Sequence, residues 1–278
     1  MIRLSFYFLM VALLAACAST NRASNPAELA RTLDKAIVAI PVSKYSKNFD
    51  SESNYADVYD KFWQVKNEIA KIPDEAKIPL VIYMHGCSGI GFRERVHIRF
   101  LFDNNYAVLA PDSFARDYKP KSCNPYSRTG GLHRGVLRFR LAEARFAHEF
   151  AKTLPWVDKQ NIFLMGFSQG GITTARYGQG GLAGRVILGW TCNSGWTEYR
   201  GIVGPRDEPI LAVVSQKDPW YSAFWVHGHC GMFMASRKNS ESVVLDGTFH
   251  DVLALLGVQE KVIQFLRAHT HSSKPIDE

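Results

Sequence analysis

The sequence predicts an α/β fold, with a mostly parallel central sheet and helices on both faces of that sheet. Short apolar runs recur along the chain, turn residues bound them, and stretches with helical spacing lie between them. Of the 278 residues, 46% are hydrophobic and 21% are charged, which is typical of a globular protein. One sheet accounts for residues 76–278, so we expect a single α/β domain there.

The apolar runs are the expected strands of this sheet. Each run is short and continuous, as strands are when both of their faces are buried. The predicted strands are residues 80–84, 106–110, 161–165, 185–190, 209–214 and 242–245. Because strand and helix alternate along the chain, the strands are expected to run parallel.

Helical spacing marks the segments between and around the strands. Apolar residues share one helical face within residues 136–154 and again within residues 252–266. Further upstream, an amphipathic helix is expected from the spacing of Val58, Phe62, Val65, Ile69 and Ile72. Residues 36–40 fit either a strand or the end of a helix. We therefore expect residues 30–75 to form an N-terminal extension that packs on the domain.

The N-terminus has the features of a secretory signal. Arg3 precedes an apolar run at residues 4–14, which is too short to span a bilayer comfortably. Leu14-Ala15-Ala16-Cys17 resembles the lipobox of bacterial lipoproteins, in which residues such as 1–16 are removed and the cysteine is lipidated. Residues 17–29 would then be the lipidated Cys17 and a polar tether. The alternative is an ordinary signal peptide with a chance cysteine. In a Gram-negative cell, Ala18 favours an outer-membrane lipoprotein that faces the periplasm.

Four further cysteines and the net charge bear on compartment and partners. An exported chain meets an oxidising compartment, and an even number of cysteines suits disulfides. The four cysteines are Cys87, Cys123, Cys192 and Cys230. Four cysteines can pair in three ways, and the sequence leaves all three open; free buried thiols are the alternative. The net charge of +7 is scattered along the chain. No basic run is long enough to indicate a nucleic-acid partner, although attraction to anionic envelope surfaces fits the sign of the charge.

The segment Gly166-Phe167-Ser168-Gln169-Gly170 matches the pattern G-x-S-x-G. A predicted strand precedes it and a helix fits after it, which is the context in which this pattern exposes a nucleophilic serine on a sharp turn. Glycine on each side of Ser168 tolerates such a turn. The alternative is a serine that only caps the following helix.

A nucleophilic serine needs a base, and the base needs an orienting acid. Catalytic groups of a parallel sheet gather at the carboxyl ends of its strands. Asp218 follows the strand at 209–214, and His250 follows the strand at 242–245. We therefore predict a Ser168–Asp218–His250 triad. Asp112, which follows an earlier strand, is the alternative acid.

Other charged residues near these positions receive structural interpretations. Asp246 and Asp251 lie close to His250 in sequence and are expected to be solvated in a loop or to cap a helix. His148 is expected within a helix, and His269 and His271 in a polar tail.

Acyl transfer develops an oxyanion, which requires preorganised N–H donors. One predicted donor is the amide of Gln169, which follows the nucleophile. The other is the amide of Cys87 in the glycine-bearing loop at residues 85–89. Ser88 lies in the same loop, but it lacks the flanking strand-to-helix elbow of the Ser168 segment.

An aromatic segment lies between the predicted acid and base. We expect Trp220 and Tyr221 to contribute to a substrate pocket that suits an acyl or aryl group. His227, His229 and Cys230 could together bind zinc, but no other ligand cluster accompanies them. No metal and no organic cofactor is predicted.

Several motifs together resemble the dienelactone hydrolase branch of the α/β-hydrolase superfamily. They occur in the family's order over residues 78–268: residues 85–89, 108–114, 166–171, 217–220 and 249–250. The resemblance implies an α/β-hydrolase fold and hydrolysis of a carboxylic ester. It also implies a disulfide between Cys87 and Cys123, and with it one between Cys192 and Cys230.

The sequence departs from this branch in two ways. Ser168 stands where the namesake enzymes have a cysteine, which favours a general serine esterase over a lactone hydrolase. A helix is expected in place of the family's N-terminal β-hairpin. The predicted function is an exported, lipid-anchored serine hydrolase that forms an acyl-enzyme with a small-molecule ester. The alternatives are a serine peptidase or amidase, and a non-catalytic lipoprotein that binds envelope ligands.

Overall fold

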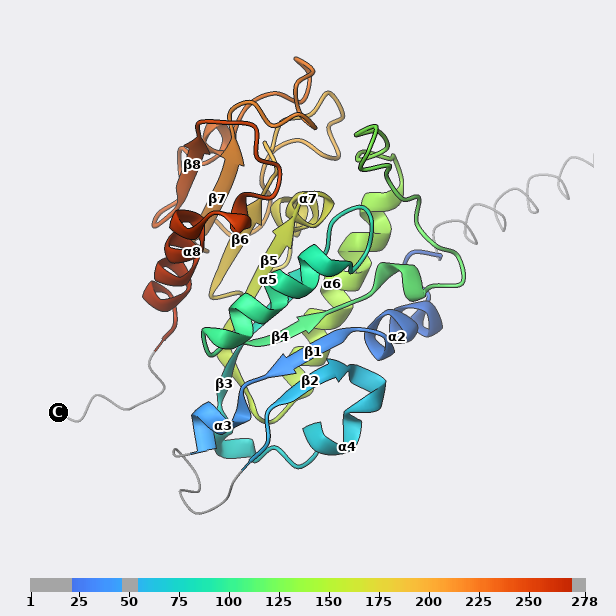
Figure 1. Ribbon diagram of the computed structural model, residues 1–278, viewed down its shortest axis with the longest axis vertical. Coiled ribbons are helices and arrows are strands. Elements are labelled where there is room, and N and C mark those ends of the chain that lie inside the picture. Colours follow the sequence, from blue (N-terminus) through green and yellow to red (C-terminus); the bar gives the residue numbers. More distant parts are fainter. Residues whose placement is uncertain (1–21, 47–54, 272–278) are drawn as a thin grey trace, which may run out of the picture.

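The computed structural model describes residues 22–46 and 55–271, whose strands form one eight-stranded sheet (Figure 1). The strand order is β2-β1-β4-β3-β5-β6-β7-β8. The strands are β1 (Ile37–Ile40), β2 (Val58–Lys61), β3 (Ile78–Met84), β4 (Ala107–Ala110), β5 (Val157–Phe167), β6 (Gly184–Leu188), β7 (Ile210–Ser215) and β8 (Glu241–Leu245). All pairings from β4 to β8 are parallel, so the predicted strands and the mostly parallel sheet are confirmed.

The helices connect these strands. They are α2 (Pro26–Asp34), α3 (Val42–Tyr45), α4 (Lys66–Ile69), α5 (Phe92–Asp103), α6 (Val136–Thr153), α7 (Gln169–Arg176) and α8 (Leu256–Ala268). Short 3-10 turns are η2 (Phe62–Gln64), η3 (Asp74–Ala76), η4 (Ser113–Ala115), η5 (Cys230–Phe233) and η6 (Val252–Ala254). The two helices expected downstream of residue 76 are thus present as α6 and α8.

Helices cover both faces of the sheet, as predicted. Side chains of a strand alternate between its two faces, so neighbouring residues of β3 enter different cores. Leu80 and Ile82 pack in the core that contains α6. Val81 and Tyr83 pack in the core that contains α5 and α8, which lie together in front of the sheet in Figure 1. Apolar burial on both faces accounts for the continuous apolar runs of the sequence.

The N-terminal region differs from the prediction. The spacing of Val58, Phe62 and Val65 predicted a helix, but Val58–Lys61 is strand β2, followed by the 3-10 turn η2. β2 pairs antiparallel with β1, which in turn pairs antiparallel with β4. The N-terminal region therefore contains a pair of antiparallel strands, and the expectation of a helix in place of a β-hairpin was wrong. Residues 37–40, which fitted either element, are strand.

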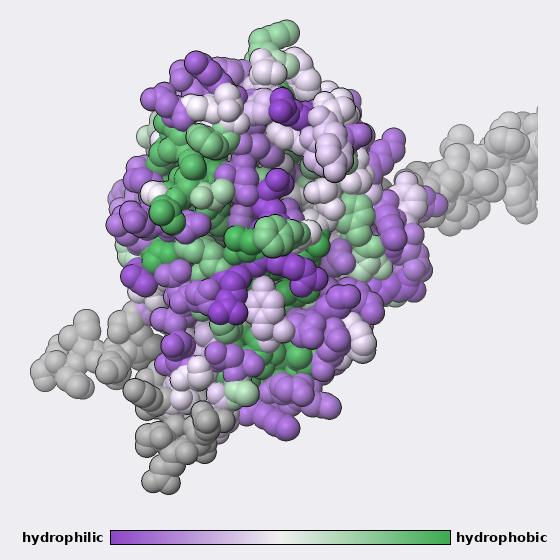
Figure 2. Space-filling model, in the orientation of Figure 1, coloured by the Kyte–Doolittle hydropathy of each residue, from purple (hydrophilic) through white to green (hydrophobic). Residues whose placement is uncertain are grey.

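The face of the molecule seen in Figure 2 mixes polar and apolar side chains. Helix α5 lies on this face, and it leaves Phe92 84% exposed and Val96 45% exposed. Within residues 22–46 and 55–271, no helix combines the length and the apolarity that crossing a membrane requires.

Candidate active site

Ser168 lies at a sharp turn between β5 and α7. Its backbone has φ of 55° and ψ of −116°, in a region that residues other than glycine seldom adopt. The turn brings α7 very close to the end of β3, because a Cβ on Gly170 would lie 1.8 Å from the Met84 carbonyl oxygen. A Cβ on Gly166 would lie 2.1 Å from the Gly170 carbonyl oxygen. The two glycines of the motif are therefore needed for close backbone contact at a strained serine.

The structure brings the three predicted catalytic side chains together. His250 Nε2 is 3.0 Å from Ser168 Oγ, and His250 Nδ1 is 2.7 Å from Asp218 Oδ2. Asp218 follows β7 and His250 follows β8, so both lie at the carboxyl ends of parallel strands. The side chain of Asp218 is 1% exposed and that of His250 is 14% exposed. Asp112, the alternative acid, instead accepts a hydrogen bond from the Phe114 amide at the start of η4.

The hydrogen bonds of Asp218 fix the tautomer of His250. Asp218 Oδ1 accepts from the Trp220 amide at 3.0 Å, which holds the carboxylate in place. Because Asp218 is an acceptor as a carboxylate, His250 Nδ1 carries the proton and donates it to Oδ2. His250 Nε2 is then free to accept the proton of Ser168 Oγ, which is the arrangement of a base beside a nucleophile.

Two aromatic side chains enclose the base. The Trp220 ring stacks on His250 with centroids 5.3 Å apart, and the Tyr221 ring meets it edge-on at 5.7 Å. Burial raises the pKa of Tyr221 well above its usual value, an effect that the adjacent Ser168 hydroxyl partly opposes. Both residues expected in the pocket thus contact His250, and Tyr221 also lies beside Ser168.

Two backbone amides remain free beside Ser168. Among the described residues, neither the Gln169 amide nor the Cys87 amide donates a hydrogen bond to a protein acceptor. Gln169 is the first residue of α7, and the loop that carries Cys87 begins where β3 ends beside Gly170. A helix N-terminus also adds partial positive charge at this place. This geometry suits the two predicted oxyanion donors.

The loop that carries His250 is anchored by a network that sequence reasoning missed. Asp251 accepts a hydrogen bond from His97 Nε2 at 2.9 Å and pairs with Arg93 at 3.0 Å. His97 Nδ1 in turn lies 2.7 Å from the Tyr83 hydroxyl. Burial raises the pKa of Asp251, but the hydrogen bond and charge of His97, together with Arg93 and His250, hold it below its usual value.

Asp251 does occupy the N-cap position of η6, but its side chain makes no cap bond there and contacts His97 and Arg93 instead, so the expectation of a solvated or capping side chain was wrong. His97 lies on the buried side of α5, but nothing in the spacing of that helix identified its distant partner.

Both expected disulfides are confirmed. Cys87 bonds to Cys123, and Cys192 bonds to Cys230. Cys230 is therefore not a thiolate that could join His227 and His229 at a zinc ion. Within the part of the chain that the structure describes, no three potential ligands from His, Cys, Asp and Glu lie close enough together to hold a metal ion.

The strand order, the strained serine and the chain order Ser–Asp–His define an α/β-hydrolase fold. No family model and no curated protein matches the sequence.

Similar solved structures include Est1E from Butyrivibrio proteoclasticus, which is 17% identical with a TM-score of 0.49 over 72% of this chain and 90% of that one. A putative dienelactone hydrolase from Klebsiella pneumoniae is 20% identical with a TM-score of 0.49 over 69% and 86%. A phospholipase/carboxylesterase from Dyadobacter fermentans is 16% identical with a TM-score of 0.47 over 70% and 93%.

Proposed function

We propose that the protein is a serine hydrolase that cleaves a carboxylic ester through an acyl-enzyme. The observation that carries the proposal is the position of His250, with Nε2 3.0 Å from Ser168 Oγ and Nδ1 2.7 Å from Asp218. Distances of about 2.6–3.2 Å are those at which a base activates a nucleophile.

The reaction follows from this geometry. His250 Nε2 takes the proton of Ser168 Oγ as that oxygen attacks the ester carbonyl. The carbonyl oxygen becomes an oxyanion, and the amides of Gln169 and Cys87 donate hydrogen bonds to it. His250 returns the proton to the departing alcohol, which leaves the acyl group on Ser168. A water molecule, deprotonated by His250, then releases the acid and restores the serine.

The surroundings of the triad favour a substrate with an apolar acyl or aryl part. Trp220 stacks on His250. Two further aromatic side chains are exposed: Phe224, shortly after Trp220 in the sequence, at 90%, and Phe249, next to His250, at 48%. Such side chains on a surface suit contact with an apolar group of a ligand.

A fluorophosphonate probe tests the nucleophile directly. We expect one adduct, on Ser168, that is absent in Ser168→Ala and in His250→Ala. Ser168→Ala should lower kcat for a p-nitrophenyl ester by about 10⁴-fold or more at nearly unchanged melting temperature. Ser88→Ala, which changes an exposed serine, is the matched control and should keep full activity. Labelling that survives in Ser168→Ala would contradict the proposal. Cleavage of matched amides in preference to esters would favour the amidase, and a folded protein with neither label nor turnover would favour the non-catalytic lipoprotein.

Export and lipid anchoring form part of the same proposal. They are supported by the sequence around Cys17, which lies outside the described residues, and by two disulfides that suit an oxidising compartment. In a Gram-negative cell, the protein would be held at the outer membrane and face the periplasm. Labelled palmitate should enter the wild-type protein but not Cys17→Ser, which should leave the membrane fraction. Equal membrane retention of both proteins would exclude this anchor.

A further inference from the structure

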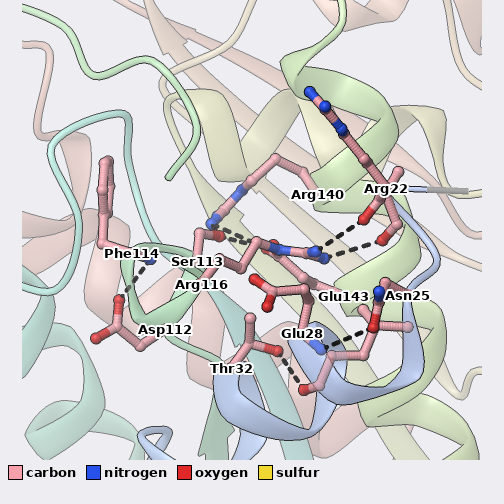
Figure 3. Close-up of polar contacts among 12 residues, drawn as sticks. Arg22, Asn25, Glu28, Thr32, Asp112, Ser113, Phe114, Arg116, Arg140 and Glu143 are labelled. Atoms are coloured by element: carbon pink, nitrogen blue, oxygen red, sulfur yellow. Dashed lines mark hydrogen bonds and ion pairs between the residues drawn. The ribbon is translucent and has the colours of Figure 1, made fainter. Parts of the chain in front are cut away.

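A group of charged and polar side chains is buried behind the loop that carries Cys87. Two of them, Ser113 and Arg116, follow β4, and two others, Arg140 and Glu143, come from α6 (Figure 3). The two arginines and the glutamate have side chains no more than 1% exposed. We call these four residues the buried Arg–Glu network.

The contacts within this network pair the buried charges, although Arg140 Nε itself has no hydrogen-bond partner among the described residues. Glu143 accepts from Arg116 Nε at 2.6 Å through one oxygen and from the Ser113 hydroxyl through the other. Arg140 Nη1 donates to Ser113 Oγ and lies 3.5 Å from Glu143. Arg116 also donates to the carbonyl oxygens of Arg22 and Ala23. A buried charge without such partners would cost several kcal/mol, so these side chains are held firmly in one arrangement.

His85 is the first residue of the loop at residues 85–89, which carries Cys87 and which we call the oxyanion loop. It connects the network to that loop. Arg140 Nη1 and the Ser113 amide both point at His85 Nε2, at 2.7 Å and 3.2 Å. Since both of these groups can only donate, Nε2 must be the acceptor and the ring proton must be on Nδ1. His85 Nδ1 therefore donates to the Gly86 carbonyl oxygen at 2.6 Å. Burial, together with the charge of Arg140, holds the pKa of His85 well below its usual value, so the ring stays neutral.

The shorter of the two hydrogen bonds to the Gly86 carbonyl oxygen comes from His85, and the other comes from the Gly89 amide at 3.3 Å; together they orient the peptide that carries the Cys87 amide. The Gly86 carbonyl and the Cys87 N–H belong to one planar trans peptide group, and they point in opposite directions. Fixing the Gly86 carbonyl towards His85 therefore turns the Cys87 N–H to the opposite side of the peptide, away from His85. Arg140 Nη2 strengthens this arrangement by donating to the His85 carbonyl oxygen at 2.7 Å.

We propose that Arg140, Glu143 and Ser113 are positioning residues for the oxyanion hole, because they hold His85 in the tautomer and orientation that aim the Cys87 amide at the substrate oxygen. None of the three touches the reacting atoms. The proposal rests on the serine hydrolase function proposed above and adds to it a second set of residues on which the reaction depends.

The test compares two buried glutamates in equivalent settings. Glu143→Gln weakens the hold on Ser113 and Arg116. Glu208→Gln is the matched control. Glu208 pairs at 2.5 Å with Arg185, a buried residue of β6, and no hydrogen bond or ion pair of Glu208 reaches the oxyanion loop. Ser113→Ala is a milder second variant if Glu143→Gln folds poorly.

For Glu143→Gln and Ser113→Ala, we expect kcat to fall about 10- to 100-fold, since loss of a whole oxyanion donor costs about 10²–10³. KM should change less than about threefold, because the ground-state ester does not yet hold the oxyanion. The inhibition constant of a trifluoromethyl ketone, which forms a tetrahedral adduct, should rise by the same factor as kcat/KM falls. Glu208→Gln should lose stability without these kinetic changes.

Amide hydrogen exchange of the peptide containing residues 85–89 gives a readout that is independent of turnover. Exchange should be faster in Glu143→Gln than in Glu208→Gln or the wild type. Unchanged exchange, or a kcat and inhibitor affinity within about threefold of wild type in the folded variants, would overturn the positioning role. Failure of the hydrolase proposal would look different, because the wild type itself would then lack a fluorophosphonate adduct on Ser168.

Discussion

Replacing Gly170 by alanine tests whether close contact between α7 and β3 is what assembles the site. The new Cβ would lie 1.8 Å from the Met84 carbonyl oxygen and 2.9 Å from that of His85. Real Cβ atoms do not approach backbone oxygens that closely, so the first turn of α7 must move away from β3 by about 1 Å. Gln169, whose amide is a proposed oxyanion donor, precedes Gly170 and must move with it.

The expected effect on catalysis is larger than the effect on stability. A displacement of about 1 Å in a catalytic group costs about 10²-fold in rate, so kcat should fall by about that factor. Overpacking costs about 1–3 kcal/mol, whereas alanine gains about 1 kcal/mol over glycine within a helix. The free energy of unfolding should therefore fall by no more than about 2 kcal/mol.

The assay combines hydrolysis of a short p-nitrophenyl ester with thermal unfolding of the same samples. Gly257→Ala in α8 is the matched control, because a Cβ there would meet nothing within 4 Å. It should raise stability by about 0.5–1 kcal/mol and leave kcat unchanged. A Gly170→Ala protein with wild-type kcat and melting temperature would refute the argument that this contact positions the site.

Three other changes probe the triad, the buried core and the oxyanion loop. Asp218→Asn should lower kcat about 10⁴-fold without a matching rise in KM, because the amide can favour the wrong tautomer of His250. A pre-steady-state assay would measure the fall in the rate of acylation. Burial lowers the pKa of His148 to about 4. As the pH falls below about 6.5, this imidazole therefore binds a proton in the unfolded chain but stays neutral in the folded protein. Stability should fall by about 1 kcal/mol for each pH unit between 6 and 4, and urea unfolding of His148→Gln should lack that slope. Replacing Cys87 and Cys123 by serine should cost about 3–4 kcal/mol by the same urea assay, since the bond joins residues separated by 36 positions.

Most of the sheet and the three residues of the candidate triad could be predicted from the sequence because their signals are local. A strand of a parallel sheet appears as a short apolar run. Ser168 follows such a run directly, and Asp218 and His250 come three and five residues after the ends of β7 and β8. Once the strands are parallel, their carboxyl ends must meet at one edge of the sheet. The positions of these three side chains then follow from the order of the strands.

The region around β2 could not be predicted in the same way. Val58, Phe62 and Val65 do share a buried or half-buried side, as their spacing indicates. That spacing fits one helix, but it also fits a short strand followed by a 3-10 turn. The choice between them depends on pairing with β1, which is a tertiary contact that spacing does not encode.

The buried Arg–Glu network escaped prediction for a related reason. Arg140 and Glu143 lie in α6, where charged residues are normally expected on the solvent side. Their partners come from the segment after β4 and from His85, so the network exists only after the fold has formed. Sequence reasoning placed the Cys87 amide in the site but gave no account of what aims it.

The crowded turn at Ser168 contrasts with the exposed side chains of the segment after Asp218, and this contrast determines which substitutions the molecule can accept. Substitutions at Gly166 or Gly170 would force backbone atoms apart, so the chemistry tolerates almost no variation there. Between Asp218 and His250, side chains such as Phe224 at 90% exposure can be replaced without disturbing a core. New substrate preferences can therefore arise by exchange of side chains in this segment while the reaction itself is preserved, which makes it the natural target for libraries in directed evolution.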